Sequence, residues 1–467
     1  MASSRKNASR RASKASTQPP LNLREQGRAL RQHAPRKAHA DWKVATRGRD
    51  VLGILRESER GRVAELLPIR HARMLQSPFA FYRGGAAIMG ADLARTPVTG
   101  LRVQAGGDCH PANFGGFATP ERRLLFDVND FDETLPAPWE WDLKRLAAGF
   151  VVASRGNGIG EARSREIVES AVRGYRERMH AVAGETALQV WYARVDLDAL
   201  PSITGDPTIF EFARRDVRQA LADAHVESHV PVRHVRSGSG LALVDHPPLL
   251  YHLKGAHDQH LRRLLGAALK RYRESLADER RVLFDRYRLA DLAIKVVGVG
   301  SVGTLCAVAL FVAGKDDTLL LQVKEARRSV LEAHAGKSRY GDHGQRVVVG
   351  QRLMQAASDV FLGWCPGSAE RHFYVRQLND AKLKPLIERF DARQMAEYAL
   401  VCGTVLANAH ARSGPAAAIA AYLGRGRHFD ACMADFAHAY ADQNEADYAR
   451  FKKAALGGEI EVATGPV

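Results

Sequence analysis

The residues of this chain best suited to chemistry lie in two neighbouring segments, 107–115 and 126–133. So many carboxylates close together are costly without a cation, so the grouping favours a functional site. Aspartate serves in proton transfer, and carboxylate oxygens are ligands that Mg²⁺ prefers. The candidate residues are Asp108, His110, Asn113, Asp127, Asp130 and Asp132.

The first segment, Gly107-Asp108-x-His110-x-x-Asn113, resembles the catalytic loop of aminoglycoside phosphotransferases and choline-kinase-like enzymes. The resemblance implies that Asp108 accepts the proton of a substrate hydroxyl and that Asn113 ligates magnesium. Both residues belong on one tight loop, because base and metal must face the same γ-phosphate. The resemblance also implies a metal-binding aspartate after the next strand. Asp130 stands there, with Asp132 and Asp127 as competing choices.

Two other interpretations of the acidic cluster stay open. The acids could cap turns and pair with Arg122, Arg123 or Lys144. They could instead form a metal-dependent hydrolase site in which His110 is a ligand. No second histidine motif of ligand spacing stands out among the 18 histidines, which favours His110 as a residue that braces the loop.

A glycine-rich segment, 298–304, lies between two predicted strands, 293–299 and 304–312. A dinucleotide-binding glycine motif needs a helix N-terminus behind it, so this position argues against one. It favours the hairpin that covers the phosphates of ATP in kinases, since glycine lets backbone amides approach phosphate oxygens. An ordinary glycine-rich β-turn is the alternative. The candidate nucleotide-binding residues are Gly298, Gly300, Ser301 and Gly303.

Lys324 ends a third predicted strand, 318–323, and resembles the kinase lysine that contacts the α- and β-phosphates. An edge charge on an apolar strand is the alternative interpretation. The glutamate that would hold this lysine stays open, with Glu332 as a candidate. Arg83 and Lys144 are further candidates for contacts to phosphate or substrate.

The pattern of the remaining chain predicts the elements that must position these residues. Helices are expected within 42–76 (interrupted at Pro68), at 140–154, 161–184, 208–224, 256–279 and 345–361, and over 390–454 with a break near 413–415. Further strands are expected at 102–105, 123–129 and 373–378, with a turn at 135–139. The resulting domain division is a tail, 1–40; a helical lobe with the catalytic and metal loops, 41–290; a β-rich nucleotide-binding lobe, 291–385; and C-terminal helices packing on the large lobe, 386–454.

Over about residues 25–450 the chain is similar to a bacterial family of unknown function, DUF2252. The matching blocks are 77–84, 107–115, 129–134, 138–146, 295–303, 323–326, 350–355, 361–364 and 409–414. Kinases place the glycine loop and lysine before the catalytic loop, whereas here Asp108 precedes Lys324. We therefore expect an α+β, two-lobed protein-kinase-like fold in circularly permuted order. It has a mostly helical large lobe and a small antiparallel β-rich lobe.

Composition bounds the remaining expectations. The net charge is +16, and residues 1–40 hold ten Lys or Arg and one acid, which predicts a disordered tail with at most weak nucleic-acid binding; an organelle transit peptide is an alternative. The five cysteines form no CxxC pair, and no apolar run is long enough to span a membrane or form a signal peptide, so we expect a cytoplasmic protein.

The function expected from these residues is Mg²⁺-dependent transfer of the γ-phosphate of ATP to the hydroxyl of an unidentified small molecule or protein. Acceptor pockets carry no short motif, so the sequence does not name the acceptor, and oligomeric state also stays open. A non-catalytic nucleotide-binding pseudokinase and the metal-dependent hydrolase are the alternatives.

Overall fold

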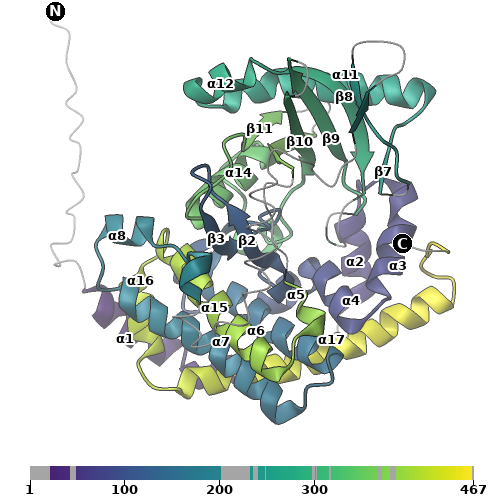
Figure 1. The fold of residues 1–467 in the computed structure, drawn as a ribbon. Helices are drawn as coiled ribbons and strands as arrows, with labels where there is room; N and C mark the ends of the chain where they lie inside the picture. The colour runs from purple at the N-terminus through teal and green to yellow at the C-terminus, as the bar shows by residue number, and fades with distance from the viewer. Residues whose placement is uncertain are drawn as a thin grey trace, which may run out of the picture.

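The computed structural model describes residues 22–42, 49–200, 232–234, 240–247, 249–296, 300, 302–314, 317–366, 371–378 and 385–464. These residues form helices and small antiparallel sheets, which confirms the predicted α+β class (Figure 1). The helix predicted at 208–224 lies outside the described residues. No helix of the described part is long and apolar enough to cross a membrane.

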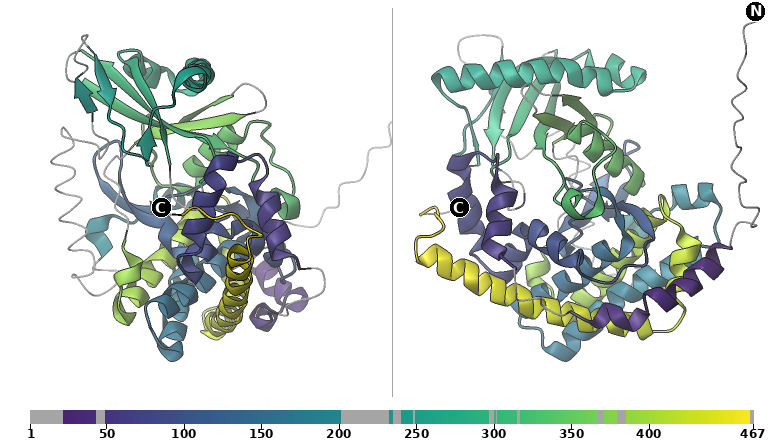
Figure 2. Two further views of the ribbon diagram at one scale, coloured as in Figure 1. Left: turned by 90° about the vertical axis from the view of Figure 1, so that its right-hand side faces the viewer. Right: turned by 180° about the vertical axis from the view of Figure 1, so that it is seen from behind.

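Four long helices build the core of the helical part: α6 (Trp139–Gly156), α7 (Glu161–Val182), α15 (Ala392–Ala411) and α17 (His428–Leu456). Two glycines allow α7 and α15 to pack closely. A Cβ on Gly403 would lie 1.9 Å from the carbonyl oxygen of Ala171, and one on Gly174 would lie 2.3 Å from that of Leu400. α6 is buried from residue 139 to 154, so it is the central helix. α17 runs along the base of the molecule (Figure 2).

The first described residues pack on the C-terminal helices. α1 (Leu23–His33) lies against α16 (Ala416–Leu423), and η1 (Arg36–Ala40) lies against α17. Arg31 Nε and Arg36 Nη1 donate to the last carbonyls of α16, at 3.0 Å from Tyr422 and 2.8 Å from Leu423. The prediction of a disordered tail is therefore wrong for residues 22–40, because these side chains cap α16; residues 1–21 lie outside the described part.

A group of short helices follows: α2 (Val51–Glu59), η2 (Ala64–Leu66), α3 (Leu67–Met74), α4 (Pro78–Gly84) and α5 (Ala86–Leu93). Asp50 caps α2 and Ser77 caps α4 with side-chain hydrogen bonds. Pro68 does not break the helix as predicted, since it stands in the first turn of α3, where a missing N–H costs nothing. The group packs through Val51, Leu55 and Phe81 on the C-terminal end of α17.

The largest sheet has six antiparallel strands. Their order is β11 (Gly363–Pro366), β12 (His372–Gln377), β10 (Asp317–Ala326), β9 (Cys306–Ala313), β8 (Arg288–Lys295) and β7 (Leu250–Tyr251). Three of these are the strands predicted around the glycine segment, and β12 is the strand predicted at 373–378. β7 and β11 were not predicted, because they are too short for an alternating pattern to be distinct.

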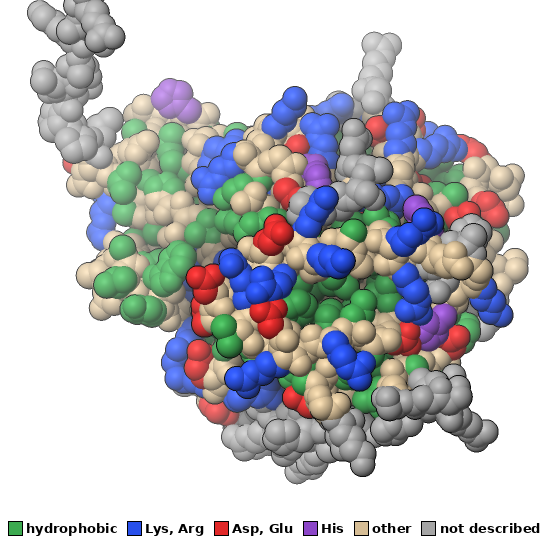
Figure 3. Space-filling view, turned by 90° about the horizontal axis from the view of Figure 1, so that it is seen from above, with side chains coloured by type: hydrophobic (Ala, Val, Ile, Leu, Met, Phe, Trp, Pro, Cys, Tyr) green, Lys and Arg blue, Asp and Glu red, His purple; other side chains and the backbone are tan. Residues whose placement is uncertain are grey.

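Both faces of this sheet are covered, because its side chains alternate between two apolar clusters. Ala307, Ala309 and Phe311 of β9 face α11 (Gly255–Tyr272) and α12 (Asp278–Phe284), whereas Val308 and Leu310 face the other side. β6 (Leu241–Leu243), which pairs with β5 (Val232–His234), packs on that second side. Viewed from above, basic and acidic side chains are interspersed over the surface (Figure 3).

Two small two-stranded antiparallel sheets lie between the large sheet and the helical core. β1 (Arg102–Ala105) pairs with β4 (Leu135–Pro138), and β2 (Phe114–Ala118) pairs with β3 (Leu124–Val128). The turn predicted at 135–139 is therefore a strand, because its backbone completes the ladder to β1. The remaining elements are α8 (Ala187–Tyr192), η4 (Leu197–Ala199), η5 (Arg273–Ser275), α13 (Glu332–Ala335), α14 (His343–Met354) and η7 (Ile387–Arg389), with η3 (Pro111–Asn113) before β2.

Candidate active site

The loop that follows β1 is held from below by α6. Both carboxylate oxygens of Asp142 accept backbone hydrogen bonds, from Gly106 at 2.7 Å and Gly107 at 2.9 Å, and His410 Nε2 lies 3.1 Å from the same carboxylate. Gly107 has φ +81°, and a Cβ there would lie 2.5 Å from the carbonyl oxygen of Glu133. Only glycine fits this turn without strain, which explains the residue before Asp108.

Asp108 is paired with a buried arginine. Arg145 Nε of α6 donates to Asp108 Oδ1 at 2.8 Å, and Arg145 Nη2 lies 2.6 Å from the same oxygen in an ion pair. Burial raises the pKa of Asp108 to about 7, although Arg145 lowers it; Asp130 and Glu133 add to the rise. A carboxylate with this pKa exchanges its proton near neutral pH, which suits a general base.

The other predicted residues of this loop have structural contacts as well. Asn113 Nδ2 donates to the carbonyl oxygen of Asp108 at 2.8 Å, which leaves its amide oxygen as the atom that could bind a metal. His110 is buried, packs edge-on to Phe79, and lies 3.9 Å from Asp108 Oδ2. Burial, with the charges of Arg145 and Arg83, lowers the pKa of His110 well below its usual value, so the ring is neutral. These contacts fit the bracing role.

Lys324 contacts the 130–133 loop, although it is 192 residues distant from Asp132 in the sequence. Lys324 Nζ is 2.9 Å from Asp132 Oδ2, and the Tyr374 hydroxyl donates to Oδ1 at 2.6 Å. Burial disfavours the ionised form of each side chain, but the attraction between the two opposite charges is stronger. The pKa of Asp132 therefore falls to about 2, and the pKa of Lys324 rises. The partner of Lys324 is thus Asp132, while Glu332 pairs with Arg328 at 3.0 Å.

Asp130 lies between these two centres. Its Oδ1 accepts a 3.2 Å hydrogen bond from the backbone of Asp132, and its charge raises the pKa values of both Asp108 and Lys324. Both oxygens of Asp132 are engaged by Lys324 and Tyr374, so Asp130 is the better placed metal ligand of the two. Within the described residues, no group of three or more His, Cys, Asp or Glu side chains is placed to hold a metal ion.

Two predicted residues are not brought to this place. Asp127 is buried and accepts from the backbone of Val128 at 2.9 Å and of Ala356 at 3.2 Å. Lys144 is fully buried in the helical core, 4.8 Å from the centre of the Phe436 ring. Neither lines the cavity described next. Helical spacing explains Lys144, because α6 turns it away from the face that carries Arg145.

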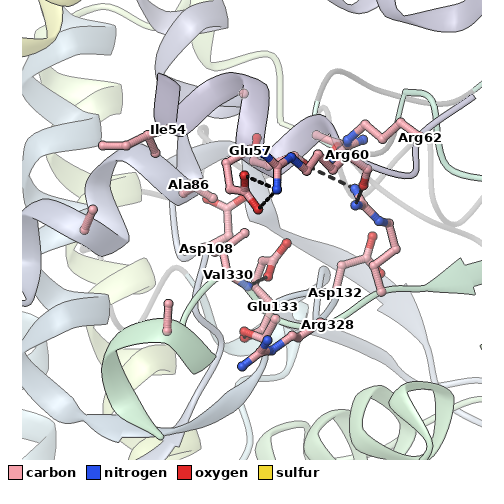
Figure 4. Close-up of a pocket in the computed structure, with 18 of the residues that line it drawn as sticks. Ile54, Glu57, Arg60, Arg62, Ala86, Asp108, Asp132, Glu133, Arg328 and Val330 are labelled. Atoms are coloured by element: carbon pink, nitrogen blue, oxygen red, sulfur yellow. Dashed lines mark hydrogen bonds and ion pairs between the residues drawn. The ribbon is translucent and has the colours of Figure 1, made fainter. Parts of the chain in front are cut away.

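A cavity of about 680 Å³ is lined by some of the remaining predicted residues, but not by Lys324, Asn113, His110 or Gly303 (Figure 4). It lies between the α2–α5 group, the Asp108 loop, the 130–133 loop and the segment that follows β10. Its walls include Asp108, Asp130, Asp132, Arg83 and Gly300. In the close-up, Asp108 and Glu133 lie on one side of the space and Asp132 on another, with Glu57, Arg60 and Arg62 across from them.

The glycine turn forms part of the cavity wall. Arg62 Nη1 donates to the carbonyl oxygens of Gly300 at 3.1 Å and Val302 at 2.5 Å, and the Val63 amide donates to the carbonyl of Gly303 at 2.7 Å. Gly303 has φ +87°, which a glycine adopts without strain. Gly298 and Ser301 lie outside the described residues.

Sequence reasoning missed the residues that hold this site together. Asp142 and Arg145 position the Asp108 loop, and Tyr374 contacts Asp132. Arg346 of α14 donates to the carbonyl oxygens of Asp132 at 2.7 Å, Thr134 at 2.6 Å and Arg327 at 2.8 Å. The one available signal was the block 138–146, whose acidic and basic residues are unusual in so apolar a helix.

Comparison with known proteins places the chain in a family. Searches against curated proteins and against solved structures each return no match. One family profile, described as an uncharacterized protein conserved in bacteria, matches residues 62–454. That span covers most of the chain and includes the Asp108 loop, the 130–133 loop, the glycine turn and Lys324; the chain therefore belongs to the DUF2252 family.

Proposed function

We propose that this protein transfers the γ-phosphoryl group of ATP, with Mg²⁺, to the hydroxyl of a small molecule or protein. The observation that carries the proposal is the contact of Lys324 with Asp132 at 2.9 Å, because Asp132 lines the cavity that Asp108, Asp130 and Gly300 also line. A base, metal-binding oxygens, a phosphate-binding lysine and a glycine turn are the recurring parts of phosphoryl transfer.

The path of the chain supports a permuted kinase-like arrangement. The C-terminal end of α15 lies beside β1, since the Gln104 amide donates to Ser413 Oγ at 2.7 Å and Gly414 abuts Val103. Followed in space, the large sheet leads to α15, then to β1, and then to the Asp108 loop. This is the order in which a kinase presents nucleotide lobe and catalytic loop, with the break between α15 and β1.

Each residue of the site has a distinct task in this proposal. Asp108 takes the proton from the acceptor hydroxyl, and Arg145 keeps its carboxylate in place. Asp130 and Asn113 supply a carboxylate and an amide oxygen, which fit Mg²⁺. When bound, Mg²⁺ neutralises charge on the phosphate oxygens. Lys324 exchanges its contact with Asp132 for a phosphate oxygen.

The test measures ATP binding and turnover on the full chain. We expect Mg·ATP to raise the melting temperature of the wild type and to do so much less for Lys324→Ala, because its phosphate contact is lost. Asp108→Asn should bind ATP but lose 10²-fold or more in phosphoryl transfer, as expected for a missing general base. Arg339→Met, an exposed arginine outside the cavity, is the control.

The outcomes distinguish the alternatives. ATP binding that Lys324→Ala does not weaken would refute the nucleotide site. If the wild type binds ATP without turnover, and Asp108→Asn binds ATP equally well, the protein is a non-catalytic nucleotide-binding module. Hydrolysis that needs tightly held metal but no nucleotide would identify a metal-dependent hydrolase.

A further inference from the structure

Three arginines from separate segments line the cavity without a carboxylate partner. They are Arg62, before η2; Arg83, in α4; and Arg327, after β10, and we call them the cleft arginines. None of the three forms an ion pair with any described residue. The other cavity arginines are paired: Arg60 with Glu57, Arg70 with Glu59 and Arg328 with Glu332.

Hydrogen bonds orient the side chains of Arg62 and Arg327 but leave their charge uncompensated, and the side chain of Arg83 makes no hydrogen bond with any described residue. Arg62 donates to Gly300 and Val302, and Arg327 donates to the carbonyl oxygens of Ser58, at 3.0 Å, and Arg60. Carbonyl oxygens carry no net charge, so they hold a guanidinium without neutralising it. All three residues are half-buried, so part of this uncompensated charge is held away from water, which is costly unless a counter-charge binds.

The environment of two of these side chains shows that cost. Burial, with the nearby charges of Arg70 and Arg327, lowers the pKa of Arg62 to about 9; Glu133 and Glu59 offset this only in part. The Nε atoms of Arg62 and Arg83 are buried and have no hydrogen-bond acceptor among the described residues. Buried donors are normally paired, so an anionic acceptor fits this wall.

The cleft arginines lie close to the proposed base. Arg83 is near enough to His110, two residues after Asp108, for its charge to lower the pKa of that ring. Arg62 contacts the glycine turn. A group bound here would thus lie in the cavity that Asp108 also lines, and in the close-up Arg62 lies across this space from Asp108 (Figure 4).

We infer that the cleft arginines form an anion subsite for the phosphate acceptor, whose hydroxyl accompanies a phosphate group on the same molecule. The identification of the bound molecule as the phosphate acceptor rests on the proposed function, whereas the anion subsite itself does not. A guanidinium offers planar pairs of N–H donors that match phosphate oxygens, and three of them suit a dianion better than a single carboxylate does. Binding the phosphate there brings the remainder of the molecule toward Asp108.

The experiment titrates inorganic phosphate into the full chain by calorimetry, with and without a saturating non-hydrolysable ATP analogue and Mg²⁺. The variants are Arg83→Met and Arg327→Met, with Lys324→Ala as the nucleotide-site comparison and Arg339→Met as the control for net charge. The Arg83 side chain makes no hydrogen bond with any described residue, so Arg83→Met should fold normally. Melting temperatures check this for every variant.

We expect phosphate to bind the wild type in the presence of the analogue. Affinity should fall tenfold or more in Arg83→Met and Arg327→Met, and stay within twofold in Lys324→Ala and Arg339→Met. Acetate should bind at least tenfold more weakly than phosphate.

Two results would overturn the inference. One is that phosphate affinity depends on Lys324 and not on the arginines, or that the ATP analogue abolishes phosphate binding. In either case phosphate would occupy the nucleotide site. The other is wild type that binds no phosphate. If phosphate binding depends on the arginines but ATP neither binds nor turns over, the proposed function fails while the anion subsite stands.

Discussion

The contact of Lys324 with Asp132 yields the sharpest prediction for stability. Lys324→Met removes the cation and leaves the Asp132 carboxylate in place, where its side chain is 28% exposed. Removing one partner of a buried ion pair costs about 3–5 kcal/mol. Asp132 keeps the hydrogen bond of Tyr374 and some contact with water, so we expect the lower end, about 3 kcal/mol at pH 7.

The effect should depend on pH. In the wild type, the pKa of Asp132 is lowered to about 2, so the pair contributes stability above about pH 4 that is lost as pH falls toward 2. In Lys324→Met, burial is no longer opposed by the lysine, and the pKa of Asp132 rises. The variant then loses stability as the pH rises through this raised pKa of Asp132. The difference in the free energy of unfolding between wild type and variant therefore widens with pH.

The assay is urea unfolding of the full chain, followed by tryptophan fluorescence and far-ultraviolet circular dichroism. Coincident transitions of the two signals establish two-state behaviour. Lys324→Met/Asp132→Asn is the matched variant: it removes both charges and should recover about 2 kcal/mol relative to Lys324→Met. A cost below 1 kcal/mol for Lys324→Met at pH 7, or no recovery in the double variant, would refute the reasoning.

Three further predictions concern the loop, the base and the helical core. Because burial raises the pKa of Asp108 to about 7 and its carboxylate is the proposed base, kcat/KM should fall about tenfold per pH unit below 7; a flat profile from pH 5.5 to 8 would contradict this role. Gly107→Ala should destabilise the protein by about 3 kcal/mol in urea unfolding, since the added Cβ would meet the carbonyl oxygen of Glu133 at 2.5 Å. Gly100→Ala, at a similar φ but in open space, should cost about 1 kcal/mol. Equal costs of the two substitutions would argue against the close approach at Gly107. Burial lowers the pKa of Lys144 to about 7 in the folded protein, so the unfolded chain binds more protons between pH 7 and 10, and the stability of the wild type should rise with pH in this range. Lys144→Met should reduce this rise without affecting ATP binding. An unchanged pH dependence of stability in Lys144→Met would contradict this prediction.

Much of the fold was accessible from the sequence because its signals are local. Alternation of apolar residues predicted β8, β9, β10 and β12, and helical spacing predicted α6, α7 and α15. The predictions failed where packing overrides local preference. The 135–138 segment is a strand only because β1 lies beside it, and residues 22–40 are ordered only because α16 and α17 receive them.

The sequence by itself determined the chemistry that is contained within one loop. Asp108, His110 and Asn113 are five residues apart or less, so their proximity follows from chain connectivity, and Gly107 and η3 complete that loop. Only the tertiary structure decided that Lys324 meets Asp132 rather than Glu332, that Lys144 faces the core, and that three cavity arginines lack a counter-charge among the described residues. These contacts join segments some 190 to 290 residues apart, and they depend on how the sheet, the short helices and α6 pack together, which no local spacing encodes.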